Sequence, residues 1–338
     1  MQIGDIVGKP GEKVRGRLVA TYATAQMPVE IPVTIVMGAK PGRTLVVTAA
    51  LHGREMLGPL GLGKVLREID PAEMSGNLIA VPCVNMSGFE FAQRNVLWDD
   101  ADPNRQKAGK KDGTVTQQLV YHLFNEVILK GDAHIDIHSS SSVGLVWYTI
   151  YHAEDGADAE VVRKSREMCL AFGLEQVMGK TPWHGTINEE TVRAGIPAMT
   201  PEVGGGGDFY QNGRHQIDAC ARGIRNVMKL MGILPGQIET ESDKAIIWNG
   251  HTEIKNDGRG ALMLLEAKRG ERLKEGDVFA IKYDPTTGDE LARYYAPVEG
   301  TVLNTGLVWP HCPPGQFLGV LGDVMEEVNL TTHAWKWD

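Results

Sequence analysis

The chain has 338 residues, enough for one large domain, a smaller one and an extensive apolar core. Its 42% hydrophobic and 23% charged residues are typical of a soluble globular protein. The net charge of -9 argues against nucleic acid or an anionic membrane as a partner, since both carry negative charge. The sequence has no apolar leader and no run of about 18 apolar residues, so we expect a cytoplasmic protein.

Short apolar runs alternate with helical patterns from residue 29 to residue 240, as in an α/β layer fold. Several runs are almost wholly apolar, which is expected for strands of a sheet covered on both faces. We predict strands at 33–36, 45–51, 78–84, 134–138 and 145–151, and helices at 57–69, 115–130 and 213–231. Thr114 is the expected N-cap of the second helix, because its hydroxyl can accept a hydrogen bond from the first turn.

The pattern changes after Pro235. Residues 245–338 contain no amphipathic helical pattern, and their short strand-like runs are separated by Gly, Pro and Asp. These runs are 261–265, 278–282, 301–303 and 317–321. We therefore predict two domains, residues 1–240 and residues 241–338, the second of them all-β.

The four cysteines are scattered along the chain without a C-x-x-C pair. We expect them to be buried free thiols in a reducing compartment. They are Cys83, Cys169, Cys220 and Cys312.

His52 and Glu55 lie where the apolar run 45–51 meets the predicted helix 57–69. An imidazole and a carboxylate on one tight turn can both face a single Zn2+ ion, and an open zinc site needs three such ligands. The H-x-x-E spacing alone is weak, because a carboxylate at a helix start is common. The spacing therefore needs a third ligand elsewhere in the chain.

A second group of polar residues occupies the predicted strand 134–138. Residues two apart in a strand share a face, so His134, Asp136 and His138 point the same way. His138 is at the carboxyl end, where open α/β sheets bind their ligands, and is the natural third ligand. Asp136 suits a hydrogen bond to a ligating imidazole, although it could simply bind local backbone. His134 is expected in the core or in a supporting role.

Three further positions carry candidate chemistry. The planar guanidinium of arginine suits a carboxylate or a developing oxyanion, which applies to Arg94 and to Arg105 beside Asn104. Surface ion pairs are the structural alternative. Glu202 ends an apolar run just before the glycines 204–207, a place that suits a general base, although such a run can also be only a turn. No nucleotide-binding motif is present.

Taken together, these segments resemble the succinylglutamate desuccinylase/aspartoacylase family, whose catalytic domain is similar to zinc carboxypeptidases. His52-Gly-Arg-Glu55 resembles its H-G-x-E motif, Asp136-Ile-His138 its D-x-H motif, and Glu202-Val-Gly204 its catalytic-glutamate motif. Asn104-Arg105 resembles its N-R pair. Segments 11–17 and 314–319 are similar to bacterial N-acetyl-diaminobutyrate deacetylase-like members. The chain departs from the pattern at Arg54 and Pro103, which leaves the substrate open.

The resemblance implies a zinc-carboxypeptidase-like mixed sheet flanked by helices, plus a C-terminal all-β domain. Residues 1–240 would be the zinc-dependent catalytic domain. Residues 241–338 would be a non-catalytic, biotinyl/lipoyl-like module that narrows the active-site mouth, and a homo-oligomer is possible. The implied activity is removal of an acyl group from a small N-acyl amino acid.

The same resemblance implies a role for each candidate residue. One Zn2+ per subunit would be held by His52, Glu55 and His138. Glu202 would act as general base and Arg94 would stabilise the oxyanion. Asn104 and Arg105 would anchor the substrate carboxylate.

Three other functions stay open at this point. A metallocarboxypeptidase acting on peptides or cell-wall fragments would use the same machinery. A binding protein with a vestigial metal site would not need Glu202. A serine hydrolase using residues 139–142 would need a base and an elbow motif, and the sequence has neither.

Overall fold

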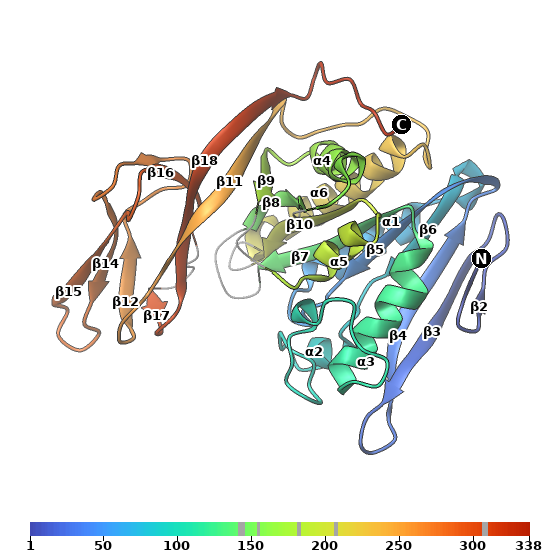
Figure 1. Ribbon diagram of the computed structural model, residues 1–338, viewed down its shortest axis with the longest axis horizontal. Coiled ribbons are helices and arrows are strands. Elements are labelled where there is room, and N and C mark those ends of the chain that lie inside the picture. The colour runs from blue at the N-terminus through green and yellow to red at the C-terminus, as the bar shows by residue number, and fades with distance from the viewer. Residues whose placement is uncertain (141–145, 154–155, 181–183, 206–208, 306–309) are drawn as a thin grey trace.

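The computed structural model describes residues 1–140, 146–153, 156–180, 184–205, 209–305 and 310–338 (Figure 1). A sheet of twelve strands runs through the molecule in the order β13-β16-β18-β11-β9-β8-β10-β7-β5-β6-β4-β3. A four-stranded sheet, β15-β14-β12-β17, lies at the far end of the C-terminal region, and β1 and β2 form a small hairpin. This mixed sheet with helices and C-terminal β-sheets confirms the predicted fold class.

The strands of the first 240 residues are β1 (Gln2–Ile3), β2 (Ile6–Val7), β3 (Lys13–Tyr22), β4 (Pro28–Met37), β5 (Lys40–Ala49), β6 (Ser75–Val81), β7 (Ala133–Ser140), β8 (Val146–Tyr151), β9 (Gln176–Lys180) and β10 (Ala198–Gly205). The α-helices are α1 (Leu57–Glu68), α2 (Met86–Glu90), α3 (Val115–His122), α4 (Ala159–Phe172), α5 (Ile187–Arg193) and α6 (Phe209–Leu230). The later strands are β11 (Lys244–Lys255), β12 (Ala261–Leu265), β13 (Arg272–Leu273), β14 (Val278–Tyr283), β15 (Glu290–Tyr295), β16 (Gly300–Thr305), β17 (His311–Cys312) and β18 (Phe317–Asn329).

Helices cover both faces of the part of the large sheet that the first 240 residues form (Figure 1). One hydrophobic core joins α1, α4 and α6 to β5 and β7, through residues such as Val47 and Ile135. A second core on the other face joins α3 and α5 to the sheet, through residues such as Val46. Because strand side chains alternate, the residues of β7 that do not enter the first core point to the α3 and α5 side. His134, Asp136 and His138 are among these residues.

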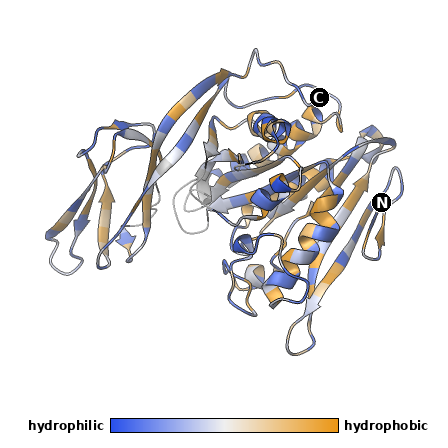
Figure 2. Cartoon of the chain, in the orientation of Figure 1, coloured by the Kyte–Doolittle hydropathy of each residue, from blue (hydrophilic) through white to orange (hydrophobic). Residues whose placement is uncertain are grey.

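The predicted helix at 115–130 forms, and its N-terminus has the expected cap. Thr114 accepts a hydrogen bond from the backbone N–H of Gln117, and the Gln117 side chain bonds back to Thr114 in a capping box. After α3 the chain continues as a π-turn over Leu123–Val127 and a 3-10 turn over Ile128–Lys130. In Figure 2 hydrophobic and hydrophilic residues alternate along α3, as expected for a helix with one buried side.

The other predicted elements are also confirmed, with shifted ends. Each predicted strand lies within or overlaps a strand of the structure, and the predicted helices at 57–69 and 213–231 correspond to α1 and α6. The start of the predicted strand at 145 lies outside the described residues. The four cysteines are buried free thiols, as expected. None of the described helices is long and apolar enough to cross a membrane.

The C-terminal region is joined to the first 240 residues through the sheet itself. β11 pairs in parallel with β9, and β18 pairs with β11 along most of its length (Figure 1). The four-stranded sheet packs on a separate small core that includes Phe279 and Leu318. Residues 241–338 thus hold their own core and also extend the large sheet. That they form a separate, non-catalytic domain stays a prediction.

Candidate metal centre

His52 and Glu55 lie on a tight turn between β5 and α1. The backbone N–H of Glu55 donates to the carbonyl of His52 over 3.0 Å, which closes the turn. Gly53 between them packs directly on the backbone of α2, where an added Cβ would lie 2.0 Å from the carbonyl carbon of Gly88. Only glycine fits at this position, and the close packing brings both side chains to the carboxyl edge of the sheet.

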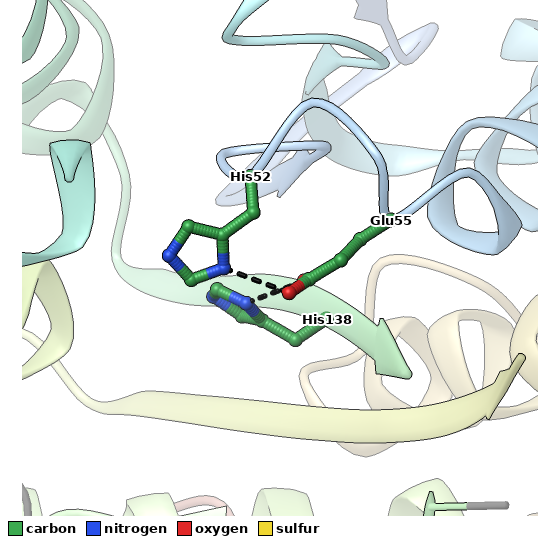
Figure 3. A group of neighbouring side chains, drawn as sticks. All are labelled: His52, Glu55 and His138. Atoms are coloured by element: carbon green, nitrogen blue, oxygen red, sulfur yellow. Dashed lines mark hydrogen bonds and ion pairs between the residues drawn. The ribbon is translucent and has the colours of Figure 1, made fainter. Parts of the chain in front are cut away.

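His138 completes a cluster of three buried side chains (Figure 3). Nδ1 of His52 lies 2.8 Å from Oε1 of Glu55, and Nδ1 of His138 lies 2.8 Å from Oε2 of the same carboxylate. One donor atom from each residue lies within 4.8 Å of the other two. The cluster joins the turn after β5 to the end of β7, two segments that are more than 80 residues apart.

The outward nitrogen of each imidazole faces a carboxylate. Nε2 of His138 lies 2.8 Å from Asp136, and Nε2 of His52 lies 3.1 Å from Asp102. A carboxylate behind each ring fixes the tautomer that leaves Nδ1 free to bind a metal. Two such imidazoles and one carboxylate, all converging, are a donor set that fits Zn2+.

The cluster keeps the Glu55 carboxylate ionised. Burial by itself raises the pKa of Glu55, but the charges and hydrogen bonds of His52 and His138 lower it well below its usual range. Burial likewise opposes ionisation of Asp136, yet the pKa of Asp136 is lowered by His138. The pKa of His138 is raised by Asp136 and Glu55 against the effect of burial.

Glu202 lies beside this cluster on β10. It is the parallel-register partner of His138, so both side chains lie on the same face of the sheet. Burial raises the pKa of Glu202 to about 7, and the nearby charge of Glu55 adds to the effect. His138, His52 and Arg94 act in the opposite direction. A carboxyl group with a pKa near neutrality can exchange protons at physiological pH.

Arg94 bridges two carboxylates at the edge of the cluster. Its Nε and one terminal nitrogen each donate to Oδ2 of Asp102 over 3.1 Å, and another terminal nitrogen lies 3.6 Å from Oε1 of Glu55. About 36% of its side chain is exposed, so part of the guanidinium still faces solvent beside the donor atoms.

Asn104 and Arg105 form the 3-10 turn that follows Asp102. The Asn104 side chain accepts a hydrogen bond of 3.0 Å from the backbone N–H of Ile187, which ties this turn to the start of α5. The Arg105 guanidinium is exposed and donates to the neighbouring carbonyl of Asn104 over 2.8 Å. The turn therefore presents a solvent-facing cation three residues after Asp102, which contacts His52.

Comparison of the sequence with known protein families identifies the family of this chain. Residues 41–231 match the model of the succinylglutamate desuccinylase/aspartoacylase catalytic domain. The chain belongs to this family. It is 25% identical over 312 residues to the N-alpha-acetyl-L-2,4-diaminobutyric acid deacetylase of Halomonas elongata, covering 89% of this chain and 88% of that protein. As a member of a family of deacylases, it is a hydrolase that acts on a linear amide bond.

Solved structures of the family share the whole fold. A succinylglutamate desuccinylase from Silicibacter sp. TM1040 aligns with a TM-score of 0.82 at 24% identity, covering 96% of this chain and 100% of that one. The product-bound ectoine utilization protein EutE (DoeB) of Ruegeria pomeroyi aligns with a TM-score of 0.81 at 23% identity, covering 95% and 99%. The C-terminal β-sheets are therefore part of the shared architecture.

Sequence analysis missed one residue of the site, Asp102. It precedes the turn that carries Asn104 and Arg105, and it contacts both His52 and Arg94. These contacts hold its pKa below the usual range, although burial opposes ionisation. A signal was present, since an acidic residue two positions before the N-R pair resembles the placement of Asp136 two positions before His138. Glycines 206–207 and serines 141–142 lie outside the described residues.

Proposed function

We propose that the chain is a Zn2+-dependent amidohydrolase that removes the acyl group from a small N-acyl amino acid. The observation that carries the proposal is the convergence of His52 Nδ1, His138 Nδ1 and the Glu55 carboxylate. The deacetylase of Halomonas elongata acts, by its name, on an N-acetylated amino acid, which supports this substrate class. Zn2+ would be held by these three side chains, one ion per subunit.

When bound, Zn2+ supplies a Lewis acid that polarises a carbonyl group and lowers the pKa of water to about 7. Glu202, on the same face as His138, takes the proton of the attacking water. It then passes this proton to the amide nitrogen as the C–N bond breaks, so that a carboxylic acid and an amine leave. Such general acid–base catalysis contributes about 100- to 10,000-fold to the rate.

Arg94 would bind the oxyanion that forms on the amide carbonyl. Its part-exposed guanidinium is oriented by Asp102, so it needs little rearrangement during the reaction. Donors of this kind contribute about 3–4 kcal/mol to the transition state. Asp102 also contacts His52, so one carboxylate orients both a metal ligand and the oxyanion donor.

Asn104 and Arg105 would bind the carboxylate of the amino acid. Arg105 is exposed and has no carboxylate partner among the described residues, so its charge is available. Asn104 is anchored to α5 and keeps the turn in place. Their contribution is orientation of the substrate rather than bond chemistry.

A panel of N-acetyl, N-formyl and N-succinyl amino acids tests the activity, assayed with and without a chelator. We expect cleavage of at least one class, loss of cleavage with chelator and recovery when Zn2+ is returned. A decapeptide is the control for the carboxypeptidase alternative, and we expect no release of its C-terminal residue. Efficient release from the decapeptide, or chelator-resistant cleavage, would contradict the proposal.

The pH dependence provides a second test, because Glu202 must be ionised to accept a proton. Its folded pKa of about 7 is raised by burial, and a bound cation would lower it toward the ordinary value of 4.5. We therefore expect kcat/KM to rise with pH, with a midpoint between these two values. The rate is measured between about pH 4 and pH 9, so that the whole range of expected midpoints is covered, with the metal content checked at each pH. A flat profile at full metal occupancy would argue against Glu202 as the base.

A further inference from the structure

A row of buried polar side chains leads away from the metal ligand His138 into the sheet. Behind His138 Nε2 lies the Asp136 carboxylate, at 2.8 Å from its Oδ2. Oδ1 of the same carboxylate lies 2.6 Å from the Thr48 hydroxyl, and that hydroxyl lies 2.9 Å from Nε2 of His134. Thr48 and His134 are at most 1% exposed. The row joins β7 to β5 on the face covered by α3 and α5.

The backbone register explains why these side chains meet. Thr48 is the parallel partner of Asp136, and Val46 is the partner of His134. Alternation along both strands places Thr48 on the same face as His134, Asp136 and His138. Neighbouring strands of one rigid sheet therefore hold the row, rather than a loop.

The donors and acceptors in the row can be assigned in only one way. An ionised carboxylate donates nothing, so the Thr48 hydroxyl must donate its single proton to Asp136. The Thr48 oxygen then accepts from His134, which fixes the proton of His134 on Nε2. Burial lowers the pKa of His134 to about 4, so the ring is neutral in this tautomer. All three hydrogen bonds in the row therefore lead to one carboxylate.

His134 occupies a costly position for a merely structural residue. Its ring is fully buried, and its Nδ1 has no hydrogen-bond partner in the described part of the chain. Burying an unpaired ring nitrogen costs free energy of folding that an apolar side chain would not cost. Nε2 of His134 makes the hydrogen bond to Thr48.

We propose that Thr48 and His134 are positioning residues for the metal ligand His138, acting through the Asp136 carboxylate. The proposal depends on the metal site proposed above. Each oxygen of Asp136 has its own donor, so the carboxylate cannot rotate about its bond to Cβ without losing a hydrogen bond. A fixed Asp136 in turn fixes the plane and the tautomer of the His138 ring, so that Nδ1 points at the metal.

Thr48→Val tests the first link, because valine keeps the shape and removes only the hydroxyl. We expect Zn2+ to bind about tenfold more weakly, at the lower end of the effect of partners that contact a ligand directly. The dissociation constant is measured by competition with a chromophoric chelator, and Co2+ is used to record the visible absorption of the site. Thr48→Ser keeps the hydroxyl, so it should restore both the affinity and the Co2+ spectrum.

Thr149→Val is the matched control. Thr149 is a fully buried threonine of β8, and its strand partner Pro201 lies on the face opposite to Glu202, outside the row. We expect wild-type metal affinity and an unchanged Co2+ spectrum. The unfolding of the metal-free variants is recorded beside these values, because a purely structural role for Thr48 would change stability and leave metal affinity as it is.

His134→Leu tests the second link, alone and combined with Thr48→Val. Since His134 acts through the Thr48 hydroxyl, the two losses of affinity should not add in the double variant. Additive losses, a Thr48→Val protein with wild-type affinity and spectrum, or equal losses in Thr149→Val would each overturn the inference. If the wild-type protein itself fails to bind Zn2+ or Co2+, the proposed metal site fails instead.

Discussion

Replacing Glu202 by glutamine is expected to lower kcat by about 100- to 10,000-fold and to leave Zn2+ binding close to wild type. Glutamine has nearly the same shape but cannot take a proton from water. Glu202 lies on the face of His138 but is not part of the converging donor set, so the metal ligands stay in place. Steady-state kinetics and metal analysis of the same preparation measure both quantities.

Glu190→Gln is the matched control for this variant. Glu190 is a glutamate of α5 whose partner is Arg193 on the same helix, away from the cluster. It should retain wild-type kcat. A Glu202→Gln protein as active as the wild type would rule out the proposed mechanism, even if the metal site itself is correct.

Glu202→Gln should not destabilise the metal-free protein. Burial raises the pKa of Glu202 from its ordinary value of 4.5 to about 7 in the folded state, so folding favours its protonated form. The contribution of Glu202 to stability is therefore present below about pH 4.5 and is lost as pH rises through 7. At pH 8 the buried Glu202 carboxylate is charged, which lowers the free energy of unfolding, and a neutral glutamine avoids this loss. Such a trade of stability for activity is expected at a functional residue. We expect a melting temperature equal to or above that of the wild type.

The second large effect is expected from His138→Ala. This variant removes one of three converging donors, and the remaining imidazole and carboxylate cannot complete a site with three protein ligands. We expect Zn2+ content to fall from about one per chain to near zero, and activity to fall to that of the chelated protein. Elemental analysis of dialysed protein and the deacylase assay measure the two losses.

His122→Ala is the corresponding control. His122 lies on α3 and pairs with Glu126 one turn further along, so it lies outside the cluster. Its removal should leave metal content and activity unchanged. Full Zn2+ occupancy in His138→Ala would show that the metal binds elsewhere, and the assignment of all three ligands would then have to be withdrawn.

Much of the fold could be predicted from local patterns. Apolar runs such as 45–51 and 78–84 correspond to β5 and β6, because buried strands need apolar side chains wherever they are paired. Thr114 indicated the start of α3, because an N-cap hydrogen bond forms within one turn of the helix. The helix α4 was not predicted, and neither was the long strand β11 that joins the C-terminal region to β9. The pairing of β11 with β9 joins segments that are distant in the sequence, and no local sequence pattern predicts such a contact.

The candidate site also has a part that could be predicted from the sequence and a part that could not. The alternation of β7 was enough to place His138 and Asp136 on one face, since that geometry is a property of any strand. Which residues then meet across strands depended on register. The contact of Asp102 with His52, and that of Thr48 with Asp136, join segments 50 and 88 residues apart. Sequence analysis left both Asp102 and Thr48 without a role for that reason.

The amino-acid sequence by itself determined the family, the mixed fold and the residue types able to bind a metal, because motif spacing and strand periodicity are local properties. The tertiary structure alone decided that His52, Glu55 and His138 converge, and which buried groups stand behind them. It also decided the raised pKa of Glu202, since a carboxyl group loses its hydration only when separate strands and loops pack around it.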